Sequence, residues 1–322
     1  MDYRKGIDGA SAAVGKVLEP GLQVHGVSGC MFRVMRQSSA MNKLATLKTT
    51  RLTPSDPEGD TVCVEKDNLR ILFENFSTLG GGLKTTTHRL ADALMIKFTE
   101  GGSRERTVML SVDEYMRLCA LKNSTEVKKQ IGSDLKTLLN MHLNFQKSSN
   151  REQSMEDIRL CCETKIKNNF IFFTFSEEFF AIMKTMPVMH YPEKLFRINL
   201  KRNPNSYYFL KKLSEHKKMN YFKKNADTIS VRTLIASTPE LPGYDEVMET
   251  DRALTRRIIE PFERDMNELA DVLNWEYCHA SGAPLTDADL ADFNYHVFSR
   301  LLVRIRWLNY PELTRKKRKQ SK

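Results

Sequence analysis

A seven-residue string occurs twice in the chain and constrains its fold more than any other feature. Leu110–Met116 and Ile229–Ile235 both have the pattern apolar-Ser-Val-x-x-apolar-apolar. In each half a helical pattern comes before the string, and a turn, a longer helix and strand-like segments come after it. Seven residues can match by chance, but a shared order of elements favours a tandem duplication. The sequence therefore predicts two copies of one α+β unit.

The order of elements in each copy is typical of a DNA-binding unit. Helix, strand, helix, turn, helix and a two-stranded wing is the order of a winged helix, the helix-turn-helix variant whose second helix enters the major groove. We therefore expect an α+β fold of two tandem winged-helix domains, over residues 68–200 and 201–309. A largely irregular arm over residues 1–67 would precede them, and a basic tail over residues 310–322 would follow. A small subdomain with a short helix is the alternative for residues 1–67.

Strands and helices can be assigned in outline from hydrophobic period and turn signals. The expected strands are Thr107–Leu110, His142–Gln146, Asp157–Lys165 and Phe170–Phe175 in the first copy, and Thr228–Val231, Asn274–Cys278 and Leu301–Trp307 in the second. Glu246–Leu273 has a long helical pattern with Pro261 inside it. An internal proline removes a helical hydrogen bond, so this helix is expected to kink or restart.

The basic residues of the chain are concentrated in its second half. The 322 residues carry a formal net charge of +10. Glu193–Arg232 has eleven basic residues against three acidic ones, and Thr314–Lys322 has six basic residues and no acidic one. Because a basic excess attracts polyanions, this distribution indicates a nucleic-acid partner bound mainly by the second copy.

Several classes of protein are disfavoured by what the sequence lacks. The seven histidines stand singly, without the H-x-H pair that a metal-dependent nicking enzyme needs. Leu83 stands between Gly82 and Lys84, so the glycine run at Gly80–Gly82 does not have phosphate-loop spacing. We expect no enzyme activity, no metal and no cofactor. The apolar runs are too short to span a bilayer, and six cysteines without a signal peptide are typical of reduced thiols, so we expect a cytoplasmic protein without membrane contact.

Candidate DNA-binding residues fall into three groups. Arginine reads guanine edges and grips phosphate, so the start of the long second-copy helix is the candidate for base readout, although a merely solvated charged face is the alternative. Lysines on the preceding helix and its loop suit phosphate contacts, and the arginines of the string and of the last strand complete the surface. These groups are Arg252, Thr255, Arg256 and Arg257; Lys211, Lys212, Lys217, Lys218, Lys223 and Lys224; and Arg232, Arg304 and Arg306.

The strand Phe170–Phe175 is apolar on both faces, unlike an ordinary half-exposed wing. Alternation places Ile171, Phe173 and Phe175 inside, and leaves Phe170 and Phe172 outside. Burial in the core is the default for such a strand. A subunit interface at Phe170 and Phe172, in which an edge strand pairs with its twin in a homodimer, is the competing interpretation.

The sequence resembles the plasmid-type replication initiators of the iteron-binding class, particularly those of Gram-positive plasmids and integrative elements. The strings that carry the resemblance are Gly81–Leu83 leading into Thr87–Leu94, Leu110–Tyr115, Arg202–Tyr207, Arg257–Glu263, and Asn274–Cys278 with Gly282–Leu285. The resemblance implies binding to direct repeats in origin DNA, local melting and recruitment of host replication proteins. It also implies dimerisation through the first winged helix and base readout mainly by the second, without a catalytic site.

Two other functions compete with this interpretation. A winged-helix transcriptional repressor without a replication role has the same fold and charge. A repressor usually needs one compact domain plus a ligand or dimer module, whereas duplicated readers suit long repeats, so the duplication favours the initiator. A nicking or priming enzyme belongs to a different class, and the missing metal constellation disfavours it.

Overall fold

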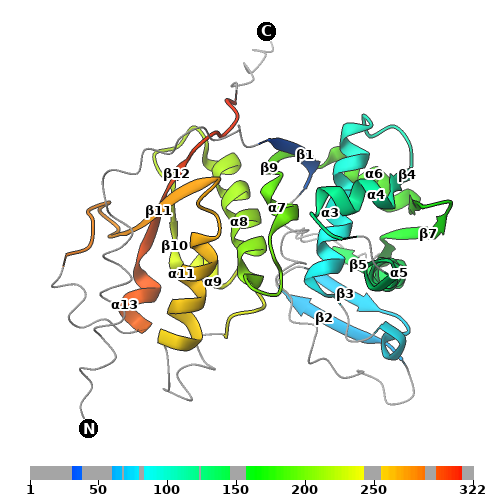
Figure 1. Ribbon diagram of the computed structural model, residues 1–322, viewed down its shortest axis with the longest axis horizontal. Coiled ribbons are helices and arrows are strands. Elements are labelled where there is room, and N and C mark those ends of the chain that lie inside the picture. The colour runs from blue at the N-terminus through cyan, green and yellow to red at the C-terminus, as the bar shows by residue number, and fades with distance from the viewer. Residues whose placement is uncertain are drawn as a thin grey trace, which may run out of the picture.

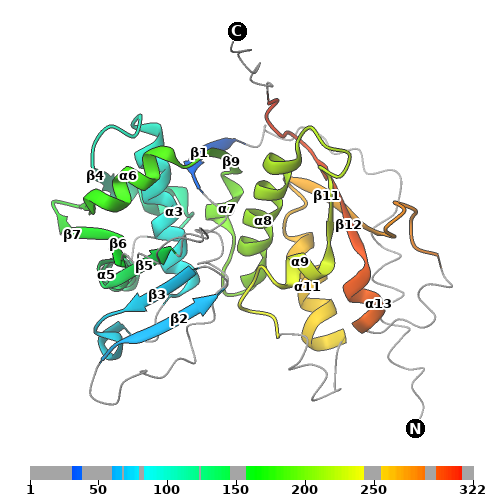
Figure 2. The same ribbon diagram turned by 180° about the vertical axis from the view of Figure 1, so that it is seen from behind.

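A computed structural model describes residues 31–37, 60–66, 69–79, 83–122, 125–145, 157–242, 255–286 and 295–313. Within these ranges the architecture is mixed α/β, with helices and four small antiparallel sheets. Two groups of elements lie on either side of the helices α3 and α8, which run through the middle of the molecule (Figures 1 and 2). No helix within the described ranges is both long and apolar enough to cross a membrane.

The first half is built around α3 and two sheets. Its elements are β2 (Val62–Lys66), β3 (Leu69–Phe73), η2 (Phe76–Leu79), α3 (Thr85–Glu100), β4 (Thr107–Ser111), α4 (Val112–Leu118), α5 (Thr125–Leu139), β5 (Met141–Phe145), β6 (Asp157–Arg159), β7 (Cys161–Lys167), β8 (Phe170–Phe175), α6 (Glu177–Thr185), β9 (Val188–Pro192) and α7 (Lys194–Arg197). One sheet has the strand order β4-β8-β7 and the other β2-β3-β5-β6. The strand expected over Asp157–Lys165 is therefore divided, because β6 and β7 belong to different sheets.

The second half has one sheet in the order β10-β12-β11. Its elements are α8 (Pro204–Asn220), β10 (Thr228–Ser230), α9 (Val231–Ile235), the π-helical turn η3 (Thr255–Ile259), α11 (Glu260–Asn267), β11 (Leu273–Cys278), α13 (Tyr295–Arg300) and β12 (Leu302–Trp307). The expected restart at Pro261 is found where η3 gives way to α11, with proline in the first turn of α11. The helix ends at Asn267, earlier than expected, and residues 243–254 lie outside the described ranges.

The two halves agree in the geometry around the repeated string. Ser111 ends β4 and pairs with Phe170 of β8, and the N–H of Val112 donates to the carbonyl of Asn169 at 2.9 Å. Ser230 ends β10 and pairs with Leu302 of β12, and the N–H of Val231 donates to the carbonyl of Leu301, also at 2.9 Å. Both sheets place the last strand in the centre, so the halves share sheet order and the register at the string, although β5 and β6 precede β7 in the first half and α13 lies between β11 and β12 in the second. The winged-helix assignment and the domain boundaries stay predictions.

The expectation of an irregular arm over residues 1–67 is wrong at two places. β1 (Phe32–Arg36) pairs with β9, and β2 pairs with β3. Met35 is fully buried, and β1 contacts α3. Because the partner of β1 lies more than 150 residues further along the chain, no local pattern could reveal it. The remainder of this arm, and residues 314–322 of the basic tail, lie outside the described ranges.

Candidate nucleic-acid interface

Lys211 on α8 is buried in the core, so its predicted role as a DNA contact is wrong. Lys211 is 5% exposed, and its Nζ lies 2.8 Å from a carboxylate oxygen of Asp92 on α3. The hydroxyl of Tyr207 donates to the same oxygen, Asp92 Oδ2, and Lys211 also donates to Asp92 Oδ1 at 3.0 Å. Burial and the neighbouring carboxylate raise the pKa of Tyr207 well above its usual value, so the phenol stays protonated. The three side chains join the two halves and leave Lys211 no access to a phosphate.

Lys217 is also engaged within the protein, which corrects its predicted role. Its Nζ lies 2.6 Å from Asp227 and above the rings of Tyr221 and Tyr310, and its side chain is only 13% exposed. Lys212 pairs with Glu215 at 3.0 Å but remains half-buried rather than enclosed. The helix α8 is therefore mainly a packing helix, which its apolar positions alone did not indicate.

Arg304 is held by its own sheet. It lies opposite Glu276 in the β11-β12 register, and its Nη1 donates to that carboxylate at 2.8 Å. Its Nη2 donates to the carbonyl of Gly282, which has φ +84° in the loop after β11. These two contacts tie β12 to β11 and to the loop after it, so Arg304 is a structural residue rather than a free DNA contact.

Five of the predicted DNA-binding residues are exposed and available to a polyanion. They are Lys223, Lys224, Arg232, Arg256 and Arg306. Three more are half-buried, Lys218, Thr255 and Arg257, and Arg252 lies outside the described residues. Arg232 lies in the first turn of α9, Arg256 in η3 and Arg306 on β12, and Lys223 and Lys224 lie between α8 and β10, so the exposed cations come from several parts of the second half.

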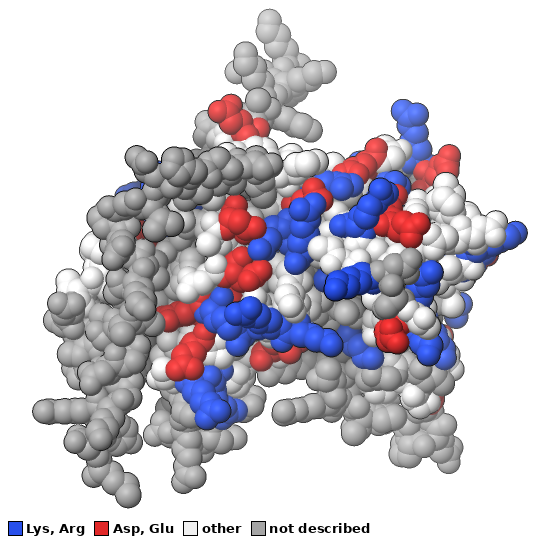
Figure 3. Space-filling model, viewed as in Figure 1, with Lys and Arg blue, Asp and Glu red and all other residues white. Residues whose placement is uncertain are grey.

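The first half offers a comparable but purely lysine-based surface. Lys128, Lys129 and Lys136 are exposed on α5, the helix that follows α4 in this half. Lys165 and Lys167 are exposed on β7, and the predicted DNA-binding set omitted them. The sequence did contain a signal for them: Lys165 and Lys167 alternate with Thr164 and Ile166 before the turn at Asn168 and Asn169, which places both lysines on one face of a strand. Figure 3 shows Lys and Arg interspersed with Asp and Glu across the middle of one face, so charge alone does not outline a single patch there.

A buried carboxylate ties α5 to α3. Asp134 accepts hydrogen bonds from the hydroxyls of Thr86 and Thr87 and from the amide of Gln130, at 2.6 to 3.1 Å. Burial raises the pKa of Asp134, and the three donors counteract part of that rise. These bonds fix the orientation of α5, and with it the direction of its exposed lysines.

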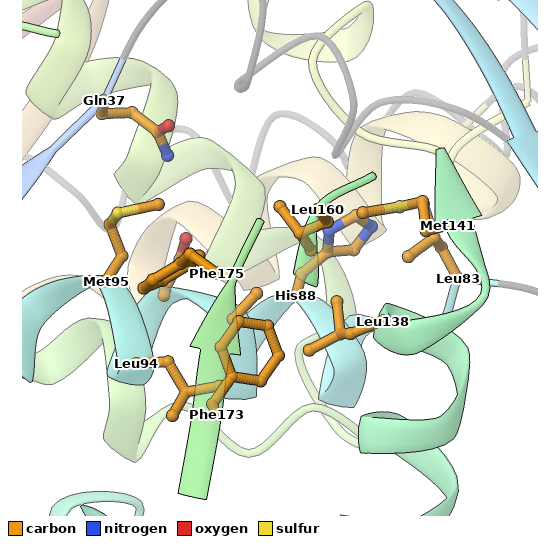
Figure 4. A pocket seen from close by; sticks show the side chains of 12 residues that line it. Gln37, Leu83, His88, Leu94, Met95, Leu138, Met141, Leu160, Phe173 and Phe175 are labelled. Carbon is orange, nitrogen blue, oxygen red and sulfur yellow. The ribbon is translucent and has the colours of Figure 1, made fainter. Parts of the chain in front are cut away.

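The core of the first half holds a small, mainly apolar cavity. Figure 4 shows it among α3, β8 and the start of β5, with Leu94, Phe173 and Phe175 turned toward it. Its volume is about 30 Å³, which is room for about one water molecule. His88 lines it, and burial lowers the pKa of this imidazole to about 3, so His88 is neutral in the folded protein.

The expected orientation of the aromatic strand is confirmed, but its expected role as an edge strand is wrong. Ile171, Phe173 and Phe175 are at most 2% exposed, whereas Phe170 is 38% exposed and Phe172 is half-buried under the Nζ of Lys165. β8 is the central strand of its sheet, with β4 and β7 on either side. Both rows of its backbone hydrogen bonds are occupied, so a second copy cannot add a strand to it.

No cluster of three His, Cys, Asp or Glu side chains suited to a metal occurs in the part of the chain that the structure describes. We expected no enzyme activity from the sequence, and nothing in the described residues tests this expectation.

No family model matches the sequence, and no curated protein matches it. Among solved structures, the chain is similar to a crystal structure of domains 2 and 3 of RctB, with a TM-score of 0.43 and 11% identity over 83% of this chain and 98% of that one. A second crystal structure of RctB domains 2-3 gives a TM-score of 0.33 and 12% identity over 68% of this chain and 83% of that one. At this distance neither the function nor the site residues of RctB transfer to the chain.

Proposed function

We propose that the chain is a replication initiator that binds repeated origin DNA through two tandem winged helices. The single observation that carries the proposal is the repeated register around Ser111 and Ser230, with the last strand central in both sheets. A duplicated reader of this kind suits DNA in which a short sequence is itself repeated. The sequence resemblance to iteron-binding initiators supports the same function.

The distribution of exposed cations supports a division of labour between the halves. In the second half Arg256 is exposed in η3, where the long helix restarts, and arginine recognises base edges bidentately. In the first half the exposed cations of α5 are lysines, which act as point charges toward phosphate. We assign base readout mainly to the second half, and backbone contacts and self-association to the first. Local melting and recruitment of host replication proteins belong to the same proposal, which involves no catalytic step.

The test is footprinting of the full chain on the DNA that flanks its own gene. Protection of evenly spaced direct repeats is expected. Arg256→Ala should reduce the preference for these repeats over random DNA by about 1 to 3 kcal/mol. Arg33→Ala is the matched control, because this guanidinium pairs with Glu100 at 2.6 Å and has no proposed DNA contact. An unchanged preference in Arg256→Ala would remove this residue from base readout, and absence of any protected repeat would contradict the function.

A permanganate assay on supercoiled repeat DNA separates the initiator from a repressor. An initiator exposes unpaired thymines beside the repeats, whereas a repressor protects the repeats without melting. A nicked product formed with magnesium would contradict the assignment as a binding protein.

A further inference from the structure

A cavity of about 520 Å³ lies between the first half and the segment that leads to the second. Its walls come from α3, from the turn between α4 and α5, from α5 and from residues 197–201. None of the predicted DNA-binding residues lines it. Its volume lies within the range of small-molecule sites in proteins.

One side chain in the wall is a buried cation without a matching anion. Arg89 is 6% exposed and forms no ion pair with any carboxylate of the described residues. Arg89 interacts with the hydroxyl of Tyr115 in the same wall, but its Nε is buried without a hydrogen-bond acceptor, and its Nη1 reaches the carbonyls of Phe196 and Ile198 only at 3.4 and 3.5 Å. Such distances exceed those of good hydrogen bonds. A guanidinium buried in this way is costly unless an acceptor satisfies it, so the cavity it lines is where an acceptor is expected.

The other charged groups of the wall are already engaged or lie at the rim. Asp134 accepts three hydrogen bonds, and Arg197 pairs with Glu193 at 2.8 Å. Glu126 and Lys201 are exposed and carry opposite charges. The enclosed part of the cavity therefore holds two buried charged groups, the hydrogen-bonded carboxylate of Asp134 and the guanidinium of Arg89, and only Arg89 has a donor left without an acceptor, which suits a ligand with a single negative charge. A phosphate ester with about two negative charges would lack a second buried cation and would face Asp134 and Glu126.

The remaining wall is largely apolar. Ile131 and Ile198 are buried, and Leu121, Val127 and Leu200 are half-buried at the edge of the hydrophobic core. Small-molecule sites commonly combine such a surface with a few polar groups that fix orientation. We propose that this cavity binds a small monocarboxylic acid with an apolar body, whose carboxylate takes hydrogen bonds from Arg89 while its chain lies against Val127 and Leu200.

The proposal is tested with hexanoate, and with hexanol and hexyl phosphate as probes of charge. Titration calorimetry and methyl NMR of the full chain should give a millimolar or lower dissociation constant for hexanoate, with shifts at Ile131 and Ile198. Hexanol should bind at least about tenfold more weakly because it leaves the guanidinium unpaired. Hexyl phosphate should bind no more tightly than hexanoate.

Two variants locate the site. Val127→Phe fills the cavity from its accessible side and should abolish hexanoate binding, whereas Met109→Phe, at an exposed position on β4, should leave it unchanged. Arg89→Gln should remove the preference for hexanoate over hexanol. If Arg89→Gln does not fold, the Val127→Phe variant and the comparison of hexanoate with hexanol still test whether the carboxylic acid binds in this cavity. Equal affinity for hexanol, tighter binding of hexyl phosphate, retained binding in Val127→Phe or no binding of hexanoate would each overturn the proposal.

Discussion

The central strands β8 and β12 hold the same place in their sheets but carry opposite chemistry on their outer faces. The paired positions of the repeat align Phe172 of β8 with Arg304 of β12. Across the sheet, Phe172 faces Lys165 at 5.5 Å from its ring, whereas Arg304 faces Glu276 at 2.8 Å. The inner positions agree, because Phe173 and its counterpart Ile305 are both buried. Packing therefore preserves the inner face of the repeated unit, while the residues of the outer face differ between the two sheets.

A second difference lies at the first helix of the repeated string. Asp113 and Glu114 occupy the first turn of α4, where the helix dipole favours acidic side chains. The corresponding turn of α9 carries Arg232 instead. The second-half unit therefore presents a cation at a position where the first-half unit presents two carboxylates, which agrees with the proposed division of labour.

The largest expected effect comes from the contact that holds the two halves together. Lys211→Ala leaves Asp92 buried without its cation and should lower the free energy of unfolding by about 3 to 5 kcal/mol. Lys97→Ala is the matched control, because Lys97 pairs with Glu114 at 2.8 Å with both side chains more than a third exposed, and it should cost about 1 kcal/mol or less. Urea unfolding measures both. Equal losses in the two variants would mean that the Asp92 contact does not couple the halves.

The inner faces of the two sheets should respond alike. Phe173→Ala should cost about 3 to 5 kcal/mol of unfolding free energy and Ile305→Ala about 2 to 5 kcal/mol, because both truncations leave cavities in a packed core. Phe170→Ala, at an exposed outer position, should cost far less. Chemical denaturation of the three variants checks this order. A large loss of unfolding free energy in Phe173→Ala with little loss in Ile305→Ala would contradict the equivalence of the two inner faces.

Substitutions on the two outer faces should affect self-association differently, and they should change the stability of the fold least. Phe172→Asp should shift a monomer-dimer equilibrium toward monomer by about tenfold or more and leave the protein folded, because the apolar outer face of β8 would be the surface a second copy covers. Arg306→Asp, on the outer face of β12, should leave the equilibrium unchanged. Sedimentation equilibrium with circular dichroism measures both quantities. A dimer that persists in Phe172→Asp would exclude this face as the interface.

Local patterns were sufficient for the repeated unit but not for its charged residues. The strand Phe170–Phe175 and its inward set follow from alternation alone, since each position needs only its neighbours to define a face. Lys211 looks like a solvated lysine because its partner, Asp92, is 119 residues away in the sequence. Met35 and β1 were missed for the same reason. The Asp227 and Glu276 partners of Lys217 and Arg304 lie closer in sequence, but a charge pair leaves no periodic signal.

The most direct test of the account is the salt dependence of repeat-DNA binding by the full chain. If six to ten exposed basic side chains of the two halves contact phosphates, the affinity should fall by about 10³ to 10⁵ between roughly 50 and 200 mM salt. Arg256→Ala should reduce the slope of log affinity against log salt concentration by about one unit or less. Lys217→Ala should leave this slope unchanged because that lysine is paired with Asp227. A nearly flat salt dependence would contradict DNA binding by the repeated unit.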